Sequence, residues 1–386
     1  MNMFWGETCK KRKVTMHTLS SYIEKIKPSI KSKLAHSSWV SERSRLNVIQ
    51  RGIGHWKLKD ITQSEVERWV NSQTSHKKTN SEPEPWSPRS RDHYFSTLKK
   101  IMDYAIEDDL IRESTLKNVS RSKPDIEAPL PFTQQEILSI SEHELTPHQA
   151  RLIFVLAVTT GLRISEIIAI GWEDINFHSK SLFVRRTKPV ANGHYEAPKS
   201  DVVARKIDLN DMAIAALRAA EIYTGERRQQ RVKVVQRDNH TVKKVGVKFV
   251  FYNPSTDRPF SEPKQYSKLY FTPLLKTLGI QHRGTKQTRH TFVVEAIKRG
   301  MTKDYIRVQL GHSRDDLFNQ HNFMNVEVKC KESKVTSVKT LPNSNKSKGI
   351  VDQNFEQLEI TKVPFIRWIL NFLRRTGMPR SRCNGY

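Results

Sequence analysis

The sequence predicts a mostly α-helical protein with a small β component, organised as an all-helical region followed by a mixed α/β region. Residues 16–122 place apolar side chains at helical spacing. Residues 132–325 combine helical patterns with segments in which apolar and polar residues alternate, as in strands. A stretch rich in serine and proline ends at residue 131, and we place a linker at 123–131.

The composition points to a polyanion as the partner. The chain has 386 residues, with 66 Lys+Arg against 40 Asp+Glu, and its formal net charge of +26 is spread along its length. Such an excess favours nucleic acid. Cys9, Cys330 and Cys383 have neither disulfide-framework nor zinc spacing, so we expect a reducing cytosol and no metal. No apolar run approaches the ~18 residues of a membrane span, and residues 1–15 lack the apolar core of a signal peptide.

In the all-helical region we expect helices at residues 17–26, 39–53, 62–72 and 90–108. The third begins with Thr62-Gln63-Ser64-Glu65, the spacing of a capping box. The fourth has the strongest pattern, because its apolar residues recur at helical spacing. A polar, proline-rich loop is expected at 76–90.

In the mixed region, residues 202–209 alternate as a strand and are expected to pair with a strand at 181–187. A buried strand is expected at 247–252, and helices at 132–142, 147–159, 211–225 and 264–278. Residues 226–245 form a strongly basic insertion. The sequence leaves open whether this insertion faces DNA or is only a solvated hairpin.

Three short motifs follow one another in the mixed region. In Thr160-Gly161-Leu162-Arg163, Gly161 is expected to end one helix and expose Arg163 before Ser165-Glu166 continue into the next. Lys286-Gln-Thr-Arg289-His290-Thr291 surrounds the start of a helix predicted at 288–299. Leu310-Gly311-His312 ends a helix predicted at 302–310. Arginine and histidine side chains at rigid helix ends suit a phosphate ligand.

These motifs, in this order, resemble the catalytic half of tyrosine recombinases, the phage integrase family. The resemblance implies a core-binding domain at 16–122 that clamps duplex DNA, and a catalytic domain at 132–325. A basic arm at 1–15 would precede them, and a divergent basic tail with a short amphipathic helix at 326–386 would follow. The resemblance also implies a homo-tetramer on DNA and no cofactor.

The same resemblance assigns roles to single residues. Arg163, Arg289 and His312 would neutralise the phosphate oxygens, and Lys286 takes the family's His-or-Lys position as a donor. Lys199 best matches the lysine that protonates the leaving oxygen, and Lys188 remains the alternative. Further phosphate contacts are expected from basic side chains in both regions: Arg89, Arg91, Lys99, Lys100, Lys188 and Arg205.

The sequence departs from the family pattern at the nucleophile. The family's tyrosine lies nine residues after the motif histidine, where this chain has His321, and no tyrosine occurs between Tyr305 and Tyr386. The leading hypothesis is an integrase of phage or mobile-element type in the bacterial cytosol, descended from active tyrosine recombinases and impaired at the nucleophile. Any remaining strand transfer would use His321 or Tyr386. The alternative is a non-catalytic DNA-binding protein that occupies attachment sites or regulates recombination.

Overall fold

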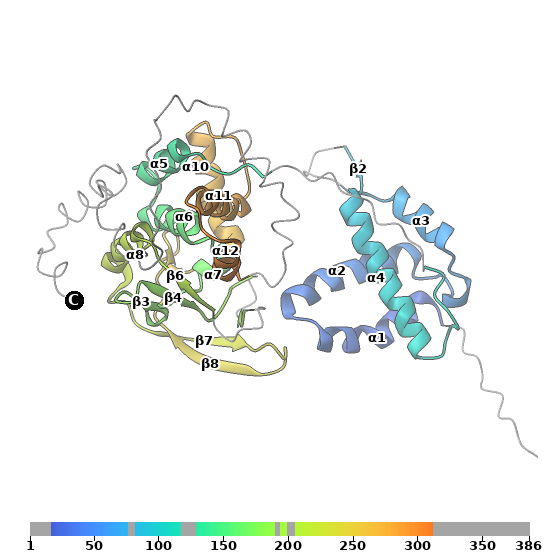
Figure 1. The fold of residues 1–386 in the computed structure, drawn as a ribbon. Helices are drawn as coiled ribbons and strands as arrows, with labels where there is room; N and C mark the ends of the chain where they lie inside the picture. Colours follow the sequence, from blue (N-terminus) through green and yellow to red (C-terminus); the bar gives the residue numbers. More distant parts are fainter. Residues whose placement is uncertain (1–16, 76–81, 117–128, 190–193, 199–204, 312–386) are drawn as a thin grey trace, which may run out of the picture. The chain divides into compact units, whose positions relative to one another are not determined.

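The computed structural model describes residues 17–75, 82–116, 129–189, 194–198 and 205–311. It divides into two compact units, Met1–Ile126 and Glu127–Tyr386, and this boundary falls inside the linker expected at 123–131. Figure 1 shows the first unit as helical and the second as a mixture of helices and small sheets. The expected arm and tail lie outside the described residues, as do Lys199, His312, His321 and Tyr386.

The first unit is built mainly from four helices: α1 (Leu19–Lys33), α2 (His36–Ile53), α3 (Gln63–Ser72) and α4 (Pro88–Glu107). Thr62 and Glu65 form the predicted capping box of α3. α1 runs past its expected end at residue 26 because Ile30 continues the buried face. A 3₁₀ turn, Leu58–Asp60, precedes α3, and β1 (Thr74–Ser75) pairs with β2 (Glu84–Pro85).

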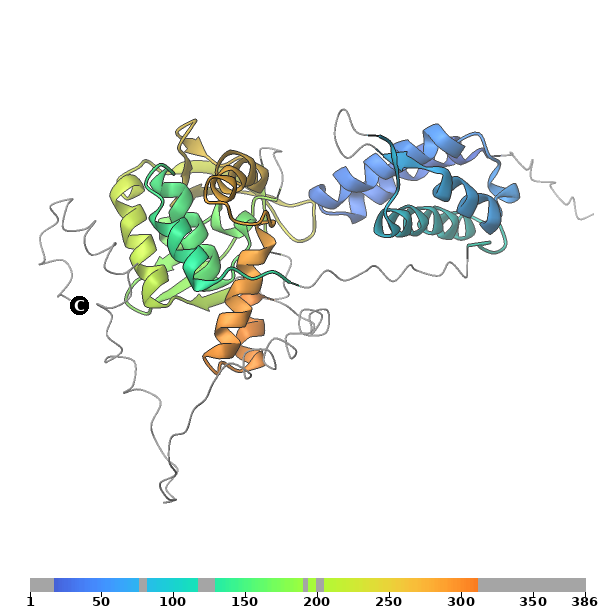
Figure 2. The ribbon, with the colours of Figure 1, turned by 90° about the horizontal axis from the view of Figure 1, so that it is seen from above.

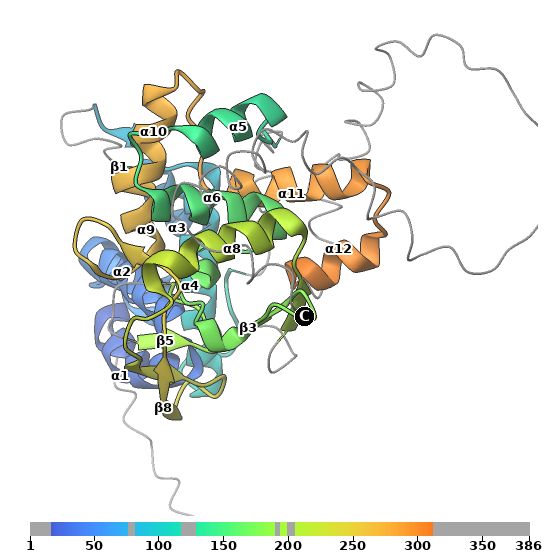
Figure 3. The same ribbon diagram turned by 90° about the vertical axis from the view of Figure 1, so that its left-hand side faces the viewer.

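The second unit is organised around α6 (His148–Thr160). All of its side chains except His148 and Thr159 are buried, as expected for a helix surrounded by other elements. α5 (Gln134–Glu142), α8 (Asp211–Thr224) and α11 (Lys286–Lys298) pack against it (Figures 2 and 3). The remaining helices near the motifs are α7 (Ile164–Ile167) and α12 (Lys303–Leu310).

One small antiparallel sheet has the order β3-β4-β6, formed by β3 (Ile175–Asn176), β4 (Ser181–Val184) and β6 (Arg205–Asp208). The 3₁₀ turn Trp172–Asp174 precedes β3. The pairing expected between residues 181–187 and 202–209 is confirmed, with Leu182 opposite Ile207. Residues 205 and 207 of β6 are buried while residues 206 and 208 are exposed, as the alternation predicts.

The basic insertion forms a hairpin within a second sheet. β5 (His194–Glu196) pairs in parallel with β7 (Gln230–Val235), which pairs antiparallel with β8 (Val242–Val247). Val232, Val234, Val245 and Val247 belong to a small apolar cluster against the body of the unit. Arg231, Lys233 and Lys244, here called the outer face of the hairpin, are exposed. Figure 1 shows this hairpin along one edge of the unit.

The strand expected at 247–252 is wrong. Val247 ends β8, and the following strand, β9 (Tyr252–Asn253), is a short one paired with β10 (Arg258–Pro259). Phe249, Val250 and Phe251 are nonetheless fully buried at 0% exposure. The apolar run therefore reflects burial, while the backbone between β8 and β9 makes only an isolated bridge from Phe249 to Gly171.

The helix expected at 264–278 is interrupted. It consists of α9 (Pro263–Tyr266), a π-helical segment (Ser267–Phe271) and α10 (Thr272–Thr277). Pro273 at the start of α10 has no backbone N–H to donate, which explains the local change in hydrogen bonding. Among the described residues, no helix has both the length and the apolar character required to cross a membrane.

Candidate functional site: an arginine cluster at the meeting of three motifs

The first motif turns sharply between α6 and α7. Gly161 ends α6 in the left-handed conformation, with φ of 69°. A Cβ at this position would lie 2.6 Å from Phe292 and 2.7 Å from Leu310, which belong to α11 and α12. Glycine is therefore required both by the backbone angle and by the close approach of the other two motifs.

Arg289 joins the backbone of all three motifs. Its guanidinium is 5% exposed and donates from Nη1 to the Gly161 carbonyl at 2.8 Å. Its Nη2 donates to the Leu310 carbonyl at 2.6 Å. One side chain of the second motif thus fixes the end of α6 to the end of α12, and satisfies two buried carbonyl groups.

Arg163 stands at the N-terminal end of α7 and its side chain is 47% exposed. Its backbone N–H donates to Glu166 Oε2 at 2.9 Å, and its Nη1 donates to Glu166 Oε1 at 3.2 Å. The Glu166 side chain is only 6% exposed. A buried carboxylate therefore fixes one end of the Arg163 guanidinium, while about half of the side chain is exposed to solvent.

Arg205 approaches the same carboxylate from β6. Its Nη1 and Nη2 donate to the two oxygens of Glu166, each at 2.9 Å, in a bidentate pair. Arg205 also lies against Gly311, where φ is 64° and an added Cβ would meet the Arg205 Cδ at 2.8 Å. β6 is in this way placed between the first and third motifs.

The cluster has more positive than negative charge. Arg163, Arg205 and Arg289 all act on the charge of Glu166. Burial alone would raise the pKa of Glu166, but hydrogen bonding and charge from Arg205, with Arg163 and Arg289 nearby, lower it to about 2. Burial, then the nearby Arg163, lowers the pKa of Arg289 to about 9. An anion bound beside Arg163 would reduce this repulsion.

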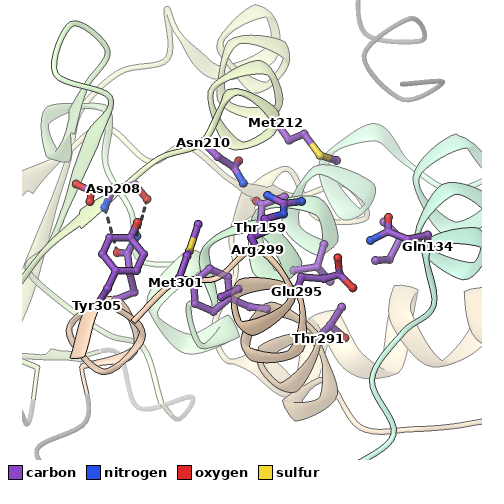
Figure 4. Close-up of a pocket in the computed structure, with 15 residues that line it drawn as sticks. Gln134, Thr159, Asp208, Asn210, Met212, Thr291, Glu295, Arg299, Met301 and Tyr305 are labelled. Carbon is purple, nitrogen blue, oxygen red and sulfur yellow. Dashed lines mark hydrogen bonds between the residues drawn. The ribbon is translucent and has the colours of Figure 1, made fainter. Parts of the chain in front are cut away.

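α12 is tied to β6 by Gln309, which is 3% exposed. The Asp208 N–H donates to Gln309 Oε1 at 3.0 Å, and Gln309 Nε2 donates to the Asp208 carbonyl at 3.1 Å and to the Tyr305 hydroxyl at 2.8 Å. Figure 4 shows Asp208 and Tyr305 beside a cavity of about 70 Å³. Among the described residues the cavity lining includes none of the three arginines, so it is separate from the cluster.

The structure places the other expected residues of the second unit as follows. Lys286 is exposed at the first position of α11. Lys188 is 3% exposed; its Nζ donates to the His194 carbonyl at 2.7 Å and its N–H donates to the Ser165 carbonyl at 2.8 Å. Burial lowers the pKa of Lys188 to about 8, against the opposing charge of nearby glutamates. Arg205 is 5% exposed, and this burial argues against a direct phosphate contact.

In the first unit, Arg89 and Lys99 are exposed on α4. Arg91 donates from Nη1 to Asn71 Oδ1 at 3.0 Å. Lys100 lies 3.7 Å from a carboxylate oxygen of Glu42, which is itself buried. Arg89 and Lys99 are thus the better placed of the four for an external ligand.

Sequence reasoning brought Arg163 and Arg289 together correctly but gave no role to Glu166, Gln309 or the packing of Gly311. Glu166 was visible as a carboxylate three residues after Arg163, on the same face of a helix. Arg205 lies on the same face of its strand as the apolar Ile207, and this was a signal in the sequence for the burial of its side chain. Nothing in the sequence indicated the partner of Gln309.

Comparisons with known proteins agree with this geometry. The model of the phage integrase family matches residues 131–322. The defective protein IntQ of Escherichia coli (strain K12) is 24% identical over 226 residues, covering 57% of this chain and 56% of that protein. Prophage integrase IntR of the same organism is 25% identical over 227 residues, covering 58% of this chain and 54% of IntR. The chain spans little more than half the length of these curated relatives.

Solved structures share the fold. The Tn1549 transposon integrase, in complex with a circular intermediate DNA, aligns with a TM-score of 0.64 and 18% identity over 82% of this chain and 99% of that chain. A lambda integrase tetramer bound to a Holliday junction aligns with a TM-score of 0.58 and 19% identity over 81% of this chain and 84% of that chain. The chain therefore shares the fold of these integrases. Residues 131–322 of this chain belong to the tyrosine recombinase, or phage integrase, family.

Proposed function

We propose that this chain binds duplex DNA and is an integrase-type recombinase, or a descendant of one, with His321 in place of the family's nucleophilic tyrosine. The observation that supports this most strongly is the arginine cluster. Arg163 presents a half-exposed guanidinium at the meeting of three motifs, beside a carboxylate that Arg163 and Arg205 bind and whose charge Arg289 also stabilises. Such a surplus of fixed positive charge is suited to one anionic group, such as a phosphodiester.

Within this proposal, each residue has a chemical role. Arg163 binds the non-bridging oxygens of the reacting phosphate, the buried Arg289 adds positive charge beside it, and His312 and Lys286 donate further hydrogen bonds. A nucleophile forms a bond to phosphorus while the bond to the 5′ oxygen breaks. That oxygen takes a proton from a lysine, for which Lys199 remains the first assignment and Lys188 the second. The products are a covalent 3′-phosphoryl protein and a free 5′ hydroxyl.

The histidine at position 321 also supports a second candidate function, in which the protein binds DNA without cleaving it. An imidazole adduct is a labile P–N bond, and the side chain is shorter than a phenol. The relative IntQ is described by its name as defective, which supports considering a form without strand transfer. The second candidate is therefore a DNA-binding protein without strand transfer, which occupies attachment sites or regulates recombination.

Covalent trapping distinguishes the two functions. The native chain and a His321→Tyr variant are incubated with a nicked suicide duplex from the DNA that flanks its own gene, and denaturing gels are used to detect an adduct. We expect an adduct with His321→Tyr, because the arginine cluster is assembled. An adduct with the native chain would assign strand transfer to His321 or Tyr386, and peptide mapping would identify which.

Arg163→Ala in the His321→Tyr background is the internal control. It should abolish the adduct while weakening DNA binding only modestly, since many phosphates contribute to affinity. If neither protein forms an adduct, the strand-transfer function fails and the DNA-binding function remains. DNA affinity that does not fall between low and moderate salt would contradict both functions.

The proposal extends to assembly and location. The lambda integrase structure is a tetramer on a Holliday junction, and we propose that this chain also forms a tetramer on DNA. Its place of action would then be the bacterial cytosol, associated with the nucleoid. Native mass spectrometry or analytical ultracentrifugation of the protein on a synthetic four-way junction tests the stoichiometry.

A further inference from the structure

We propose that Arg205 is a positioning residue for Arg163, and that it acts through Glu166. This inference rests on the proposed function, because Arg163 is the residue that would bind the reacting phosphate. It replaces the surface role that the sequence suggested for Arg205. Arg205 would touch no substrate, and would set the direction in which another arginine points.

The geometry connects the two arginines through a single carboxylate. Arg205 occupies both oxygens of Glu166 at 2.9 Å each, whereas Arg163 reaches only Oε1 with its side chain, at 3.2 Å. A bidentate guanidinium fixes the plane of a carboxylate. With that plane fixed, Glu166 offers Arg163 a contact at Oε1, and the Arg163 side chain stays 47% exposed.

The charge balance gives the direction of the effect. Glu166 is buried, and Arg205, Arg163 and Arg289 together favour its ionised form, with Arg205 compensating the charge from inside the unit. Without Arg205, Arg163 and Arg289 would still favour the ionised carboxylate, which would attract the nearest cation not bound to backbone carbonyls more strongly. That cation is Arg163, which would fold inward over Glu166 and become less exposed.

Arg205 also has no freedom to move away. Gly311 covers its aliphatic stem, since a Cβ at Gly311 would lie 2.8 Å from Cδ and 2.9 Å from Cζ of Arg205. Gln309, two residues earlier, fixes α12 to Asp208 of the same strand. The position of Arg163 is therefore linked through β6 to the end of α12, the element that precedes His312.

The first test is the chemical reactivity of Arg163 in the full chain without DNA. Phenylglyoxal modifies exposed guanidinium groups, and peptide mass spectrometry gives the rate at each arginine. Arg218 is a matched internal reference, because its side chain is 48% exposed and it pairs with Glu221 at the same i,i+3 spacing. Arg205→Met should lower the rate at Arg163 by roughly fivefold relative to Arg218. An unchanged or higher rate at Arg163 would overturn the proposal.

The second test separates positioning from simple space filling. In Arg205→Met/Glu166→Gln the carboxylate charge that would draw Arg163 inward is gone, and the reactivity of Arg163 should return at least to the parent value. If Arg205 only fills space, the double variant should behave like Arg205→Met. Thermal unfolding checks that each variant is folded. Arg205→Lys keeps the positive charge but cannot make the bidentate contact, so the rate of phenylglyoxal modification at Arg163 should be intermediate. This variant replaces Arg205→Met if the methionine variant does not fold.

A third measurement relates the inference to catalysis. In the His321→Tyr background, Arg205→Lys should reduce the rate of adduct formation by roughly tenfold with little change in DNA affinity, whereas Arg218→Lys should change neither. The reactivity measurements need neither DNA nor cleavage. The proposed function can therefore fail through a missing adduct while the positioning role stands, and normal Arg163 reactivity in Arg205→Met refutes the positioning role alone.

Discussion

The second unit contains two groups of basic side chains with opposite environments. In the arginine cluster, Arg205 and Arg289 are each 5% exposed and bind Glu166 or backbone carbonyls. On the outer face of the β7–β8 hairpin, Arg231, Lys233 and Lys244 are exposed, and Lys233 lies directly opposite Lys244. Both groups are equally basic in the sequence. The difference shows that a basic side chain holds elements of this unit together where the fold gives it a buried partner.

The largest expected effect comes from removing the buried carboxylate. Glu166→Leu leaves Arg205 charged and unpaired in the interior, and should lower the unfolding free energy of the second unit by about 3–5 kcal/mol. The matched control is Glu221→Leu, which removes the carboxylate of a half-exposed pair and should cost at most about 1 kcal/mol. Urea unfolding, with the transition of the second unit fitted separately, measures both. Equal losses of unfolding free energy in the two variants would show that Glu166 stabilises the fold no more than the carboxylate of a half-exposed pair does.

The pH dependence of stability tests the same carboxylate without mutation. The pKa of Glu166 is about 2 in the folded chain against an ordinary value of 4.5, so its ionised form stabilises the fold above about pH 4.5. That contribution, on the order of 3 kcal/mol, is lost as the pH falls from about 4.5 to 2. The unfolding free energy of Glu166→Gln should not show this decrease between about pH 4.5 and 2. A parent and a variant with the same slope in this window would contradict the assignment.

The close approach of the three motifs predicts a smaller effect at Gly161. Gly161→Ala requires an unfavourable φ and also brings Cβ within 2.7 Å of side chains in α11 and α12, so we expect a loss of about 2–3 kcal/mol. Gly279→Ala is the control, since φ is also positive at 65° but nothing lies within 4 Å of the added Cβ. It should lose only about 1 kcal/mol. Calorimetry of both variants tests whether packing or backbone angle dominates.

The smallest effect is expected on the hairpin. Lys233→Gln/Lys244→Gln removes two like charges that face each other across the strands, so stability should stay within about 0.5 kcal/mol of the parent or rise slightly. A large loss of stability, measured by the same unfolding experiment, would mean that the outer face is held by partners as the arginine cluster is. The contrast between the two regions would then disappear.

Much of the local structure could be predicted from the sequence because its causes are local. The capping box at Thr62 and Glu65, the end of α6 at Gly161 and the start of α12 at Thr302 all depend on side chains within a few residues. The pairing of β4 with β6 followed from alternation. The strand expected at 247–252 failed because a short apolar run indicates burial without indicating backbone geometry.

The site shows where the sequence ceased to be sufficient. The three motifs indicated that Arg163 and Arg289 would meet, and the family pattern supported that expectation. The sequence suggested a phosphate contact for Arg205, whereas the structure buries it on the same strand face as Ile207 and pairs it with Glu166. The ties of Gln309 to Asp208 join residues about a hundred positions apart, and no local rule reaches that distance.

By itself, the sequence determined the family motifs and the order of most helices, because each is a property of neighbouring residues. Only the tertiary structure decided which cations are buried and which carboxylate they share. Arg205 and Glu166 are separated by 39 positions in the chain. Their 2.9 Å ion pair forms because the fold places β6 beside α7 and α12. A buried charge is stable only next to its partner, and for residues this far apart in sequence only the fold supplies that partner.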